Sequence, residues 1–406
     1  MNLVPINASL INVGEPLPFV LRGGNGTLLA QKGYVIGSRS ELDSLVAKGV
    51  TLCVDTDESA ESLRAYRAKL EAMMRSSDAS LGEIAAVTLP SGAKPPAPAQ
   101  DREVRTGPTD WASLQLRATQ LLRAPETGGD FSERFTALHE ELVRHCVQAP
   151  DATMLALIFL SGQETRMYSA THAMLVSCVC MLAASGPLRW PQARVLQVGR
   201  AALSMNIAMT ELQDQLAQQA QPLAAVQVAA VESHAARSEA LLRALGVRDP
   251  AWLEAVRCHH HRTPGTLADK SEAQQMARLI QRADIFAARL APRIARNPMP
   301  VTAAMQASYY DETQQVDEAG AAIVKALGIY PPGSFVRLAS KEIAIVLRRG
   351  ATATTPRVAV VLNREGMPTG EPIPRDASQA AWKITGVASR KDVRVQLSLE
   401  RLQALA

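Results

Sequence analysis

Apolar residues recur at intervals of three and four positions through the middle of the chain, from Trp111 to about Leu327. This spacing places apolar side chains on one face of an α-helix. The same stretch is rich in alanine, leucine, glutamine and arginine and contains few β-branched runs. The pattern therefore predicts a helical domain over residues 110–330.

The pattern changes after the sequence YPPGS at residues 330–334, where apolar and polar residues begin to alternate. Alternation with a period of two is typical of β-strands with one buried face. It predicts strands within residues 335–349, 357–363 and 393–399, which glycine, proline and threonine turns separate. We therefore expect a C-terminal β module over residues 331–406.

Short apolar runs near the N-terminus are interrupted by Gly-Gly-Asn-Gly at residues 23–26, a sequence that favours a hairpin turn. They predict a small β-rich module over residues 1–57, with one short helix near Glu41–Lys48. A helix is predicted over residues 58–88, and the proline-rich residues 89–109 predict a linker. The fold class predicted for the whole chain is mainly α, with a small β-rich N-terminal segment and a C-terminal β module.

Composition narrows the classes of protein that fit this organisation. The chain has 406 residues, and 47% of them are hydrophobic, which is enough to fill a sizeable core. Forty-three basic and 39 acidic residues leave a net charge of +4, no basic run exceeds Arg348-Arg349, and aromatic residues make up only 4%. These values argue against a nucleic-acid-binding protein, whose surface is usually basic and carries aromatic residues for base stacking.

Cysteine usage and the apolar segments bear on the cellular compartment. The five cysteines contain no Cys-x-x-Cys pair, which is typical of reduced thiols in the cytoplasm. The N-terminal residues lack the basic and apolar regions of a signal peptide, and the apolar stretch at 174–184 is shorter than the roughly 20 residues that span a bilayer. We therefore expect a soluble cytoplasmic protein without a membrane or nucleic-acid partner.

Three polar residues fall on otherwise apolar faces of the predicted helices, namely His172, His234 and Asp284. A carboxylate in such a place costs several kcal/mol unless it is paired, protonated or bound to a metal. Each residue also has an ordinary structural explanation. A buried histidine is often hydrogen-bonded within the core, and Asp284 could pair with Arg278 or Arg282.

A run of three histidines, within VRCHHHRTPG at residues 256–265, is the most distinctive motif of the chain. Consecutive residues of a helix point about 100° apart, so at most two neighbouring side chains can share one site. His259 and His260 form the candidate pair, and we expect His261 to point elsewhere. The alternative is a solvated helix end without a site.

The order of these motifs resembles the HD-GYP domain family, helical metal-dependent phosphodiesterases that hydrolyse cyclic di-GMP. In that family a histidine after a Tyr-Ser/Thr pair is followed by AALLHDIGK, a histidine-proline on a helix, HHExxDGxGYP, ADxxDALT and LGxYPPGSxVxL. The chain has, over roughly residues 150–365, YSATHA, AALSMNIAM, ESHAARSEALLRALGV, VRCHHHRTPG, RADIFAARL and LGIYPPGSFVRL. The resemblance implies an HD-type helical bundle, with family metal-ligand positions at His172, His234, His259, His260 and Asp284.

The chain departs from the family at the positions that carry out the reaction. The name-giving His-Asp pair corresponds to Met205 and Asn206, and the lysine that follows corresponds to Met209. His261 replaces the glutamate of HHE, Ala287 replaces the second aspartate of ADxxDA, and the GYP triplet is absent from the sequence. A thioether and a carboxamide are poor ligands for a hard or borderline dication, and neither bridges two metals.

These departures leave an incomplete site. By family precedent His234, His259 and His260 bind one metal, whereas His172 and Asp284 are too few ligands for the second and are expected to form a buried hydrogen-bonded pair. We expect no catalytic residues at the lost positions and at most one weakly bound zinc, iron or manganese ion.

The expected function is that of a catalytically inactive module, related to cyclic di-GMP phosphodiesterases, that binds a protein partner in bacterial signalling. Binding of cyclic di-GMP has no support from the residues, because the GYP segment and the lysine are lost. The alternative is an active metal-dependent phosphohydrolase or phosphodiesterase with an altered, mononuclear, histidine-rich site.

Overall fold

The computed structural model describes residues 110–406, apart from positions 128, 163, 164, 263, 295 and 394, together with short stretches between residues 3 and 55. Contacts between residues divide the chain into two compact units, residues 1–106 and 107–406. The helices predicted near Glu41–Lys48 and over 58–88, and the linker predicted at 89–109, lie outside the described residues.

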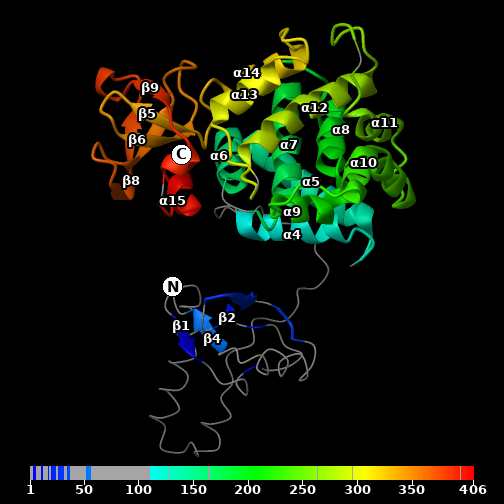
Figure 1. Cartoon of the computed structure of the whole chain (residues 1–406), viewed down its shortest axis with the longest axis horizontal. Helices are drawn as coiled ribbons and strands as arrows, with labels where there is room; N and C mark the ends of the chain where they lie inside the picture. Colours follow the sequence, from blue (N-terminus) through cyan, green and yellow to red (C-terminus); the bar gives the residue numbers. More distant parts are fainter. Residues whose placement is uncertain are drawn as a thin grey trace, which may run out of the picture. The chain divides into compact units, whose positions relative to one another are not determined.

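The first unit contains a four-stranded antiparallel sheet with the strand order β1-β4-β2-β3 (Figure 1). Its strands are β1 (Leu3–Pro5), β2 (Leu21–Gly23), β3 (Leu28–Ala30) and β4 (Leu52–Asp55). Between β2 and β3 the Gly23 amide donates to the Thr27 carbonyl at 2.7 Å, and Gly26 has a φ of +84°. Glycine adopts this left-handed conformation without steric cost, so the glycine-rich sequence forms the hairpin turn that it predicts.

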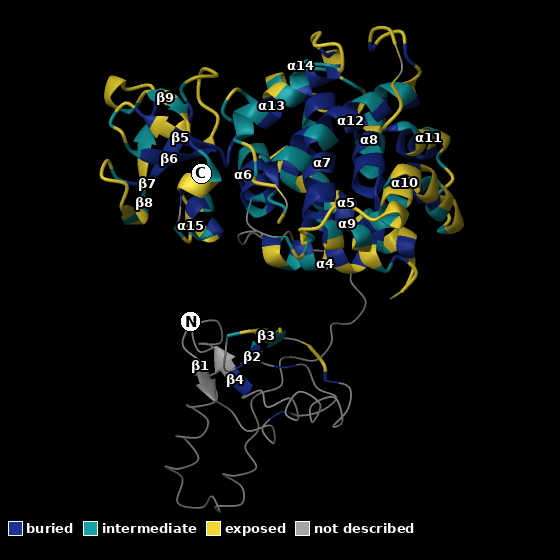
Figure 2. Cartoon of the chain, viewed as in Figure 1, coloured by how far each residue is buried: buried dark blue, intermediate teal, exposed yellow. Residues whose placement is uncertain are grey.

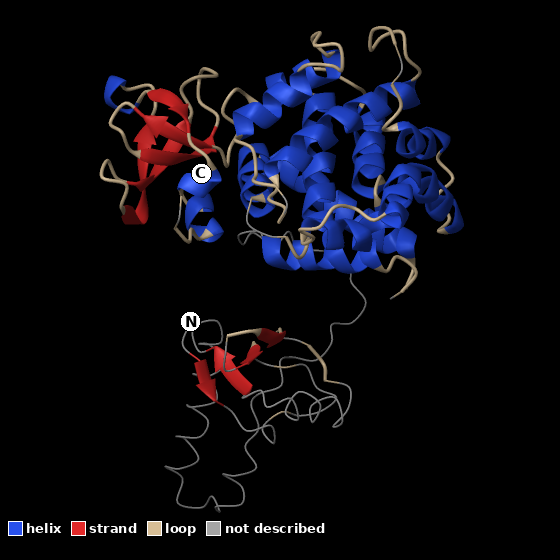
Figure 3. Cartoon of the chain, in the orientation of Figure 1, coloured by secondary structure: helices blue, strands red, loops and turns tan. Residues whose placement is uncertain are grey.

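The second unit is built mainly from helices (Figure 3). The helical region begins at Trp111 and ends at Leu327, as the hydrophobic spacing predicts. Its helices are α4 (Trp111–Arg123), α5 (Phe131–Gln148), α6 (Pro150–Ser161), α7 (Tyr168–Ser185), α8 (Gln192–Ser204), the 3₁₀ helix η2 (Ile207–Met209), α9 (Thr210–Ala217), α10 (Ala225–Ala244), α11 (Pro250–Cys258), α12 (Glu272–Leu290), α13 (Val301–Tyr309) and α14 (Glu318–Leu327). The predicted fold class is confirmed.

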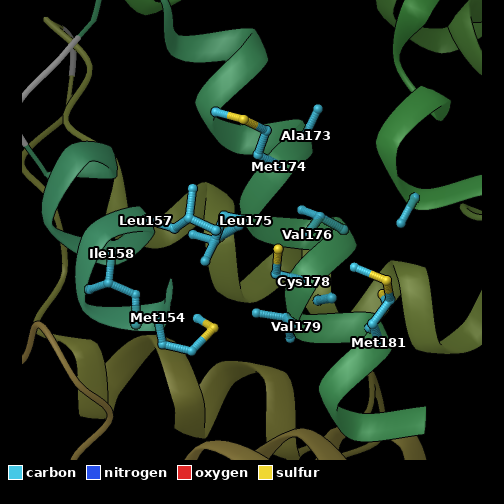
Figure 4. Close-up of a cluster of buried hydrophobic side chains, with 14 of the residues drawn as sticks. Met154, Leu157, Ile158, Ala173, Met174, Leu175, Val176, Cys178, Val179 and Met181 are labelled. Carbon is cyan, nitrogen blue, oxygen red and sulfur yellow. The ribbon is translucent and has the colours of Figure 1, made fainter. Parts of the chain in front are cut away.

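Helix α7 forms the centre of this unit and packs against α6, α8, α12 and α14. Nearly all of its side chains are buried. Figure 4 shows how α6, through Met154, Leu157 and Ile158, lies against α7, which contributes Leu175 and Val179 to the same apolar core. Removal of this surface from water is the main stabilising contribution to the bundle.

By length and apolar composition, α7 is also long enough to cross a membrane, the one such helix among the described residues. However, 89% of its 18-residue window is buried inside the unit. Figure 2 shows this arrangement, with buried residues along α7 and exposed residues on the outer helices. A helix that is surrounded by other helices is apolar all round for that reason alone.

A five-stranded antiparallel sheet follows the helices, in the order β8-β7-β6-β5-β9. Its strands are β5 (Phe335–Leu338), β6 (Ile343–Arg348), β7 (Arg357–Leu362), β8 (Pro368–Asp376) and β9 (Ile384–Val387). The strands predicted within 335–349 and 357–363 are confirmed. They form the buried centre of the sheet, and β6 packs against α6.

The strand predicted at residues 393–399 is wrong. The described residues of this stretch form no strand, and Leu399 begins helix α15 (Leu399–Gln403). Val393 and Leu399 are nevertheless buried, and Val395 and Leu397 pack against the apolar core that the helices share with the sheet. An extended segment that lies on helices alternates between buried and exposed side chains just as a strand does.

The edge strands β8 and β9 are absent from the sequence prediction. Strand β8 has the sequence PTGEPIPRD, and most of its side chains are exposed or half-buried. Prolines and charged residues are tolerated at a sheet edge because one side of the strand donates no ladder hydrogen bonds. The apolar alternation that reveals a strand is therefore weakest at the edge.

Candidate metal centre

Two helices bring three histidines together. His234 lies in the middle of α10, His259 ends α11, and His260 follows directly. The other end of α11 is fixed by the side chain of Asp249, which accepts hydrogen bonds from two amides of the first turn at 3.1 Å. Because α10 packs against α11, the histidine run lies opposite His234.

The three imidazoles present their Nε2 atoms to one another. His234 Nε2 lies 3.3 Å from His259 Nε2 and 3.2 Å from His260 Nε2. Nitrogen ligands at about 2.0–2.1 Å from a tetrahedral zinc ion are roughly 3.3–3.4 Å apart. The spacing of the imidazole nitrogens therefore fits one metal ion.

Backbone carbonyl groups orient two of these rings. His234 Nδ1 donates to the carbonyl oxygen of Val231, and His259 Nδ1 donates to that of Val256 at 2.6 Å. In a neutral imidazole whose Nδ1 carries the proton, Nε2 presents a lone pair. Lone pairs that face one another across 3.2–3.3 Å repel unless a cation or a proton lies between them.

Burial keeps these imidazoles in the form that binds metals. Burial and the positive charge of His260 lower the pKa of His259 to about 3. Burial also lowers the pKa of His234. Both rings are consequently neutral at pH 7, and neutral imidazole is the metal ligand. His260 is exposed, which leaves the cluster accessible from solvent.

His261 does not join this cluster. It is exposed, and the side chains that could hold one ion among the described residues are His234, His259 and His260. The geometry agrees with the expectation that two neighbouring histidines share a site and the third points elsewhere.

His172 and Asp284 form a separate pair that joins α7 to α12. His172 Nε2 lies 2.7 Å from Asp284 Oδ1. The side chain of His172 is buried, whereas that of Asp284 is 20% exposed. The alternative partners of Asp284 are wrong, because the guanidinium groups of Arg278 and Arg282 pair with other carboxylates.

Asp284 carries a negative charge beside the histidines. Burial raises the pKa of this carboxyl, but the hydrogen bond and positive charge of His172 outweigh that effect. Smaller contributions come from His259 and His260, and the pKa of Asp284 falls to about 2. The carboxylate therefore interacts electrostatically with both the His172 ring and the three-histidine cluster.

The positions that the resemblance assigns to the His-Asp pair, Met205 and Asn206, lie at the end of α8. Met205 is fully buried in the apolar core. Asn206 is buried as well, and its Oδ1 atom has no hydrogen-bond partner. The following 3₁₀ helix η2 packs against α10, the helix of His234. A carboxamide oxygen is a neutral ligand and cannot supply the charge of a bridging carboxylate.

The donor set fits one metal ion and does not fit two. Three neutral imidazoles are ligands typical of zinc or iron(II). At the second metal position that the resemblance implies, His172 and Asp284 supply only two ligands, and these form a hydrogen bond with each other. In the part of the chain that the structure describes, no second group of three or more histidine, cysteine or acidic side chains could hold an ion.

The sequence analysis gave no indication of Asp214, a buried carboxylate in α9. Its oxygens accept hydrogen bonds from the amide and hydroxyl of Ser169, at 2.7 and 2.8 Å, and from Arg123 at 2.9 and 2.6 Å. These bonds tie the first turn of α7, just before His172, to α4 and α9. A lone acidic residue in a polar helix usually faces solvent, so its sequence offered no signal.

Arg293 is a second residue that the sequence did not reveal. It donates to the hydroxyl oxygen of Tyr168 at 2.9 Å. Tyr168 in turn stacks on His172, with ring centroids 5.5 Å apart and planes inclined by 16°. The guanidinium thus holds the ring that packs on the His172 side of the site.

One comparison with known proteins, by sequence, agrees with the resemblance of the motifs to the HD-GYP family. No family model matches the chain. A cyclic di-GMP phosphodiesterase of Pseudomonas aeruginosa is 26% identical over 289 residues, which cover 69% of this chain and 68% of that protein. A solved HDG"Y"P protein from Bdellovibrio bacteriovorus aligns with 80% of this chain and 99% of its own, at 13% identity and a TM-score of 0.42. The sequence similarity to this phosphodiesterase agrees with the ordered motifs and supports a relationship to the HD-GYP-like family.

Proposed function

We propose that the chain is a catalytically inactive HD-GYP-like signalling protein of the cytoplasm, which holds one metal ion and acts through a protein partner. One observation carries the proposal. Three imidazole nitrogens converge at the spacing of a single ion. The resemblance to the HD-GYP family supports the proposal further, because it aligns Asn206 and Met209 with the bridging aspartate and the lysine.

Two-metal hydrolysis of a phosphodiester requires ions about 3.5–4 Å apart, held by a bridging ligand that places both on the scissile phosphate. Asn206 supplies no negative charge for such a bridge, and Met209 supplies no cation for the phosphate. Loss of one electrostatic stabiliser typically lowers kcat by about 10²–10³. The combined losses remove efficient turnover, and His234, His259 and His260 are left to bind and orient one ion.

The test combines metal analysis with a nucleotide assay on the full chain. Protein purified without chelator is expected to hold at most one transition metal ion per chain, and a His259→Ala variant is expected to hold less. Cyclic di-GMP incubated with the protein and added Mn²⁺, Fe²⁺ or Zn²⁺ should remain intact. Two tightly bound ions with turnover near about 1 s⁻¹, the low end of ordinary enzymes, would overturn the proposal.

An active mononuclear phosphohydrolase is the second candidate function. Two observations favour it: His260 leaves the cluster open to solvent, and the charged Asp284 carboxylate lies near enough to interact with the histidines. A three-histidine site with an open position is the ligand arrangement of many catalytic zinc centres. Release of nitrophenol from a bis(nitrophenyl) phosphate diester by zinc-loaded protein, absent in His259→Ala, would establish this function instead.

A further inference from the structure

A groove of about 270 Å³ lies where α9, the start of α10 and the segment after α12 come together. Its apolar lining comes from Met209, Leu216, Leu223 and Val231, and its cationic lining comes from Arg293 and Arg296. Three glutamine side chains complete it. Val231 is the residue whose carbonyl group orients His234, so the groove begins one helical turn from the metal centre.

The cationic end of this groove has no anion to balance it. Among the described residues, no carboxylate forms an ion pair with Arg289, Arg293 or Arg296, although many other arginines of the unit are paired. Burial and the positive charge of Arg293 lower the pKa of Arg296. The Nε atom of Arg293 is buried without a hydrogen-bond partner. Neighbouring like charges without a counter-charge favour an acidic ligand.

A larger cavity, of about 560 Å³, differs in this respect. It also contains charged side chains, but these are satisfied within the protein. Arg278 pairs with Asp317 at 2.7 Å, and Lys270 donates to the carbonyl oxygens of Pro264 and Gly265 at 3.0 and 2.6 Å. At the smaller groove Arg293 donates to the Tyr168 hydroxyl and Arg296 donates to the Ala288 carbonyl, but among the described residues neither guanidinium pairs with a carboxylate.

The surface around the groove is apolar beyond its walls. Val226, in the first turn of α10, is 75% exposed, and Ile294, which lies between the two arginines in the chain, is 62% exposed. The first turns of α10 are exposed as well, as Figure 2 shows. Apolar area that continues past a small pocket fits a polypeptide, which covers both, better than a small molecule, which fills only the pocket.

We infer that this groove, formed by Met209, Leu216, Leu223, Val231, Arg293 and Arg296, binds a peptide segment of a partner protein that carries apolar and acidic side chains. The apolar side chains enter between α9 and α10, and a carboxylate pairs with the two guanidinium groups. The inference rests on the proposed function, since it supplies the partner class of an inactive module. Methionine at position 209 suits such a surface, because its flexible thioether adapts to apolar side chains.

Fluorescence anisotropy on the full-length protein tests the inference with a synthetic amphipathic peptide of leucine and glutamate. Matched peptides carry lysine or glutamine in place of glutamate. The glutamate peptide is expected to bind most tightly of the three. Its affinity is expected to fall with added salt, because salt screens the carboxylate–guanidinium pairs. Equal binding of the glutamate and lysine peptides would overturn the inference.

Charge reversal locates the binding site. Arg296→Glu is expected to lower the affinity for the glutamate peptide by at least about tenfold, because it removes a central charge pair. Leu223→Glu, at an exposed position that folding tolerates, is expected to do the same. Arg364→Glu, an exposed position in the C-terminal sheet, is the matched control and should leave binding unchanged. Binding that neither groove variant reduces would overturn the inference.

Cyclic di-GMP serves as the competitor that separates this inference from the proposed function. It is expected neither to displace the peptide nor to be hydrolysed. Displacement by the nucleotide would assign the groove to a nucleotide and overturn the peptide inference. If the protein hydrolyses the nucleotide and still binds the peptide, the proposal of a catalytically inactive protein is overturned, and the assignment of the groove to a peptide is retained.

Discussion

Single side chains decide the chemistry of this protein. His234 and His259 each use Nδ1 on a backbone carbonyl, which leaves Nε2 for a ligand, and His260 brings the third nitrogen. By the resemblance to the HD-GYP family, the amide of Asn206 and the thioether of Met209 correspond to the bridging carboxylate and the lysine. The difference between a one-metal and a two-metal centre thus rests on a few atoms.

Restoring the lost pair tests this interpretation. The double variant Met205→His with Asn206→Asp should bind more metal than the parent, because it adds an imidazole and an anionic bridge to five retained ligand-type residues. Hydrolysis should stay slow, since Met209 still lacks the charge of a lysine. The readout is the number of ions per chain by elemental analysis after dialysis. Equal metal content in parent and variant would show that AALSMNIAM does not align with the family segment.

His139, in α5, makes the folding stability depend on pH. It is buried with both ring nitrogens unpartnered, and burial, reinforced by the charge of Arg200, lowers its pKa from 6.5 to about 4. The unfolded chain therefore binds this proton more readily, so the free energy of unfolding falls as the pH drops from 6.5 to 4, by up to about 3 kcal/mol.

Urea unfolding at pH 7 and pH 4.5 measures this dependence. A His139→Met variant, which fills the site without a titrating group, should lose less stability between the two pH values than the parent does. Identical losses in parent and variant would show that His139 does not titrate on unfolding.

Helix packing supplies the frame that holds these side chains. Helix α8 approaches α5 and α7 closely at Gly199, whose carbonyl oxygen accepts a hydrogen bond from the Ser177 hydroxyl at 2.8 Å. A Cβ atom at Gly199 would lie 2.6 Å from His139 Nε2 and 2.7 Å from Met181 Sδ. The glycine therefore sets the distance between α8, which leads to Asn206, and the central helix α7.

Gly199→Ala should lower the free energy of unfolding by about 1–3 kcal/mol, the cost of overpacking a well-packed core. The matched control is Gly386→Ala in β9, where a Cβ atom meets nothing within 4 Å. Urea unfolding of both variants gives the comparison. A Gly199→Ala protein as stable as the control would show that α5, α7 and α8 can separate without cost.

At the scale of the whole molecule, the helices and the C-terminal sheet share one core. Ile345 and Val361 of the sheet belong to the same apolar cluster as the residues of α7, and so does Leu402 of α15. Residues 107–406 accordingly form one compact unit. The three-histidine cluster lies within this unit, so an ion that bound there would stabilise the unit as a whole.

Zinc should therefore raise the melting temperature. A ligand at a hundredfold excess over its Kd adds about 2.7 kcal/mol, which corresponds to a rise of roughly 4 °C in melting temperature for a unit of this size. A His260→Ala variant should lose this shift, and the neighbouring His261→Ala should keep it. Calorimetry with and without chelator measures both. A shift lost in His261→Ala but kept in His260→Ala would place the ion elsewhere.

Local patterns in the sequence determined much of this architecture. The spacing of apolar residues predicted the limits of the helical region at Trp111 and Leu327, and alternation predicted β5, β6 and β7. The histidine run and its order relative to His172 and Asp284 indicated the candidate site. These inferences succeed because helix and strand periodicity, and motif order, are properties of neighbouring residues.

Only the tertiary structure decided which of these side chains meet. His172 and Asp284 are 112 positions apart in the chain, and Arg123 and Asp214 are 91 apart. Residues 393–399 alternate like a strand but, where described, pack on the core shared by the helices and the sheet, and the groove of Arg293 and Arg296 depends on three separate segments. The burial of each side chain, its hydrogen-bond partner and the direction of each ring nitrogen are set when distant elements pack together. The periodicity of apolar residues along the chain does not specify that packing.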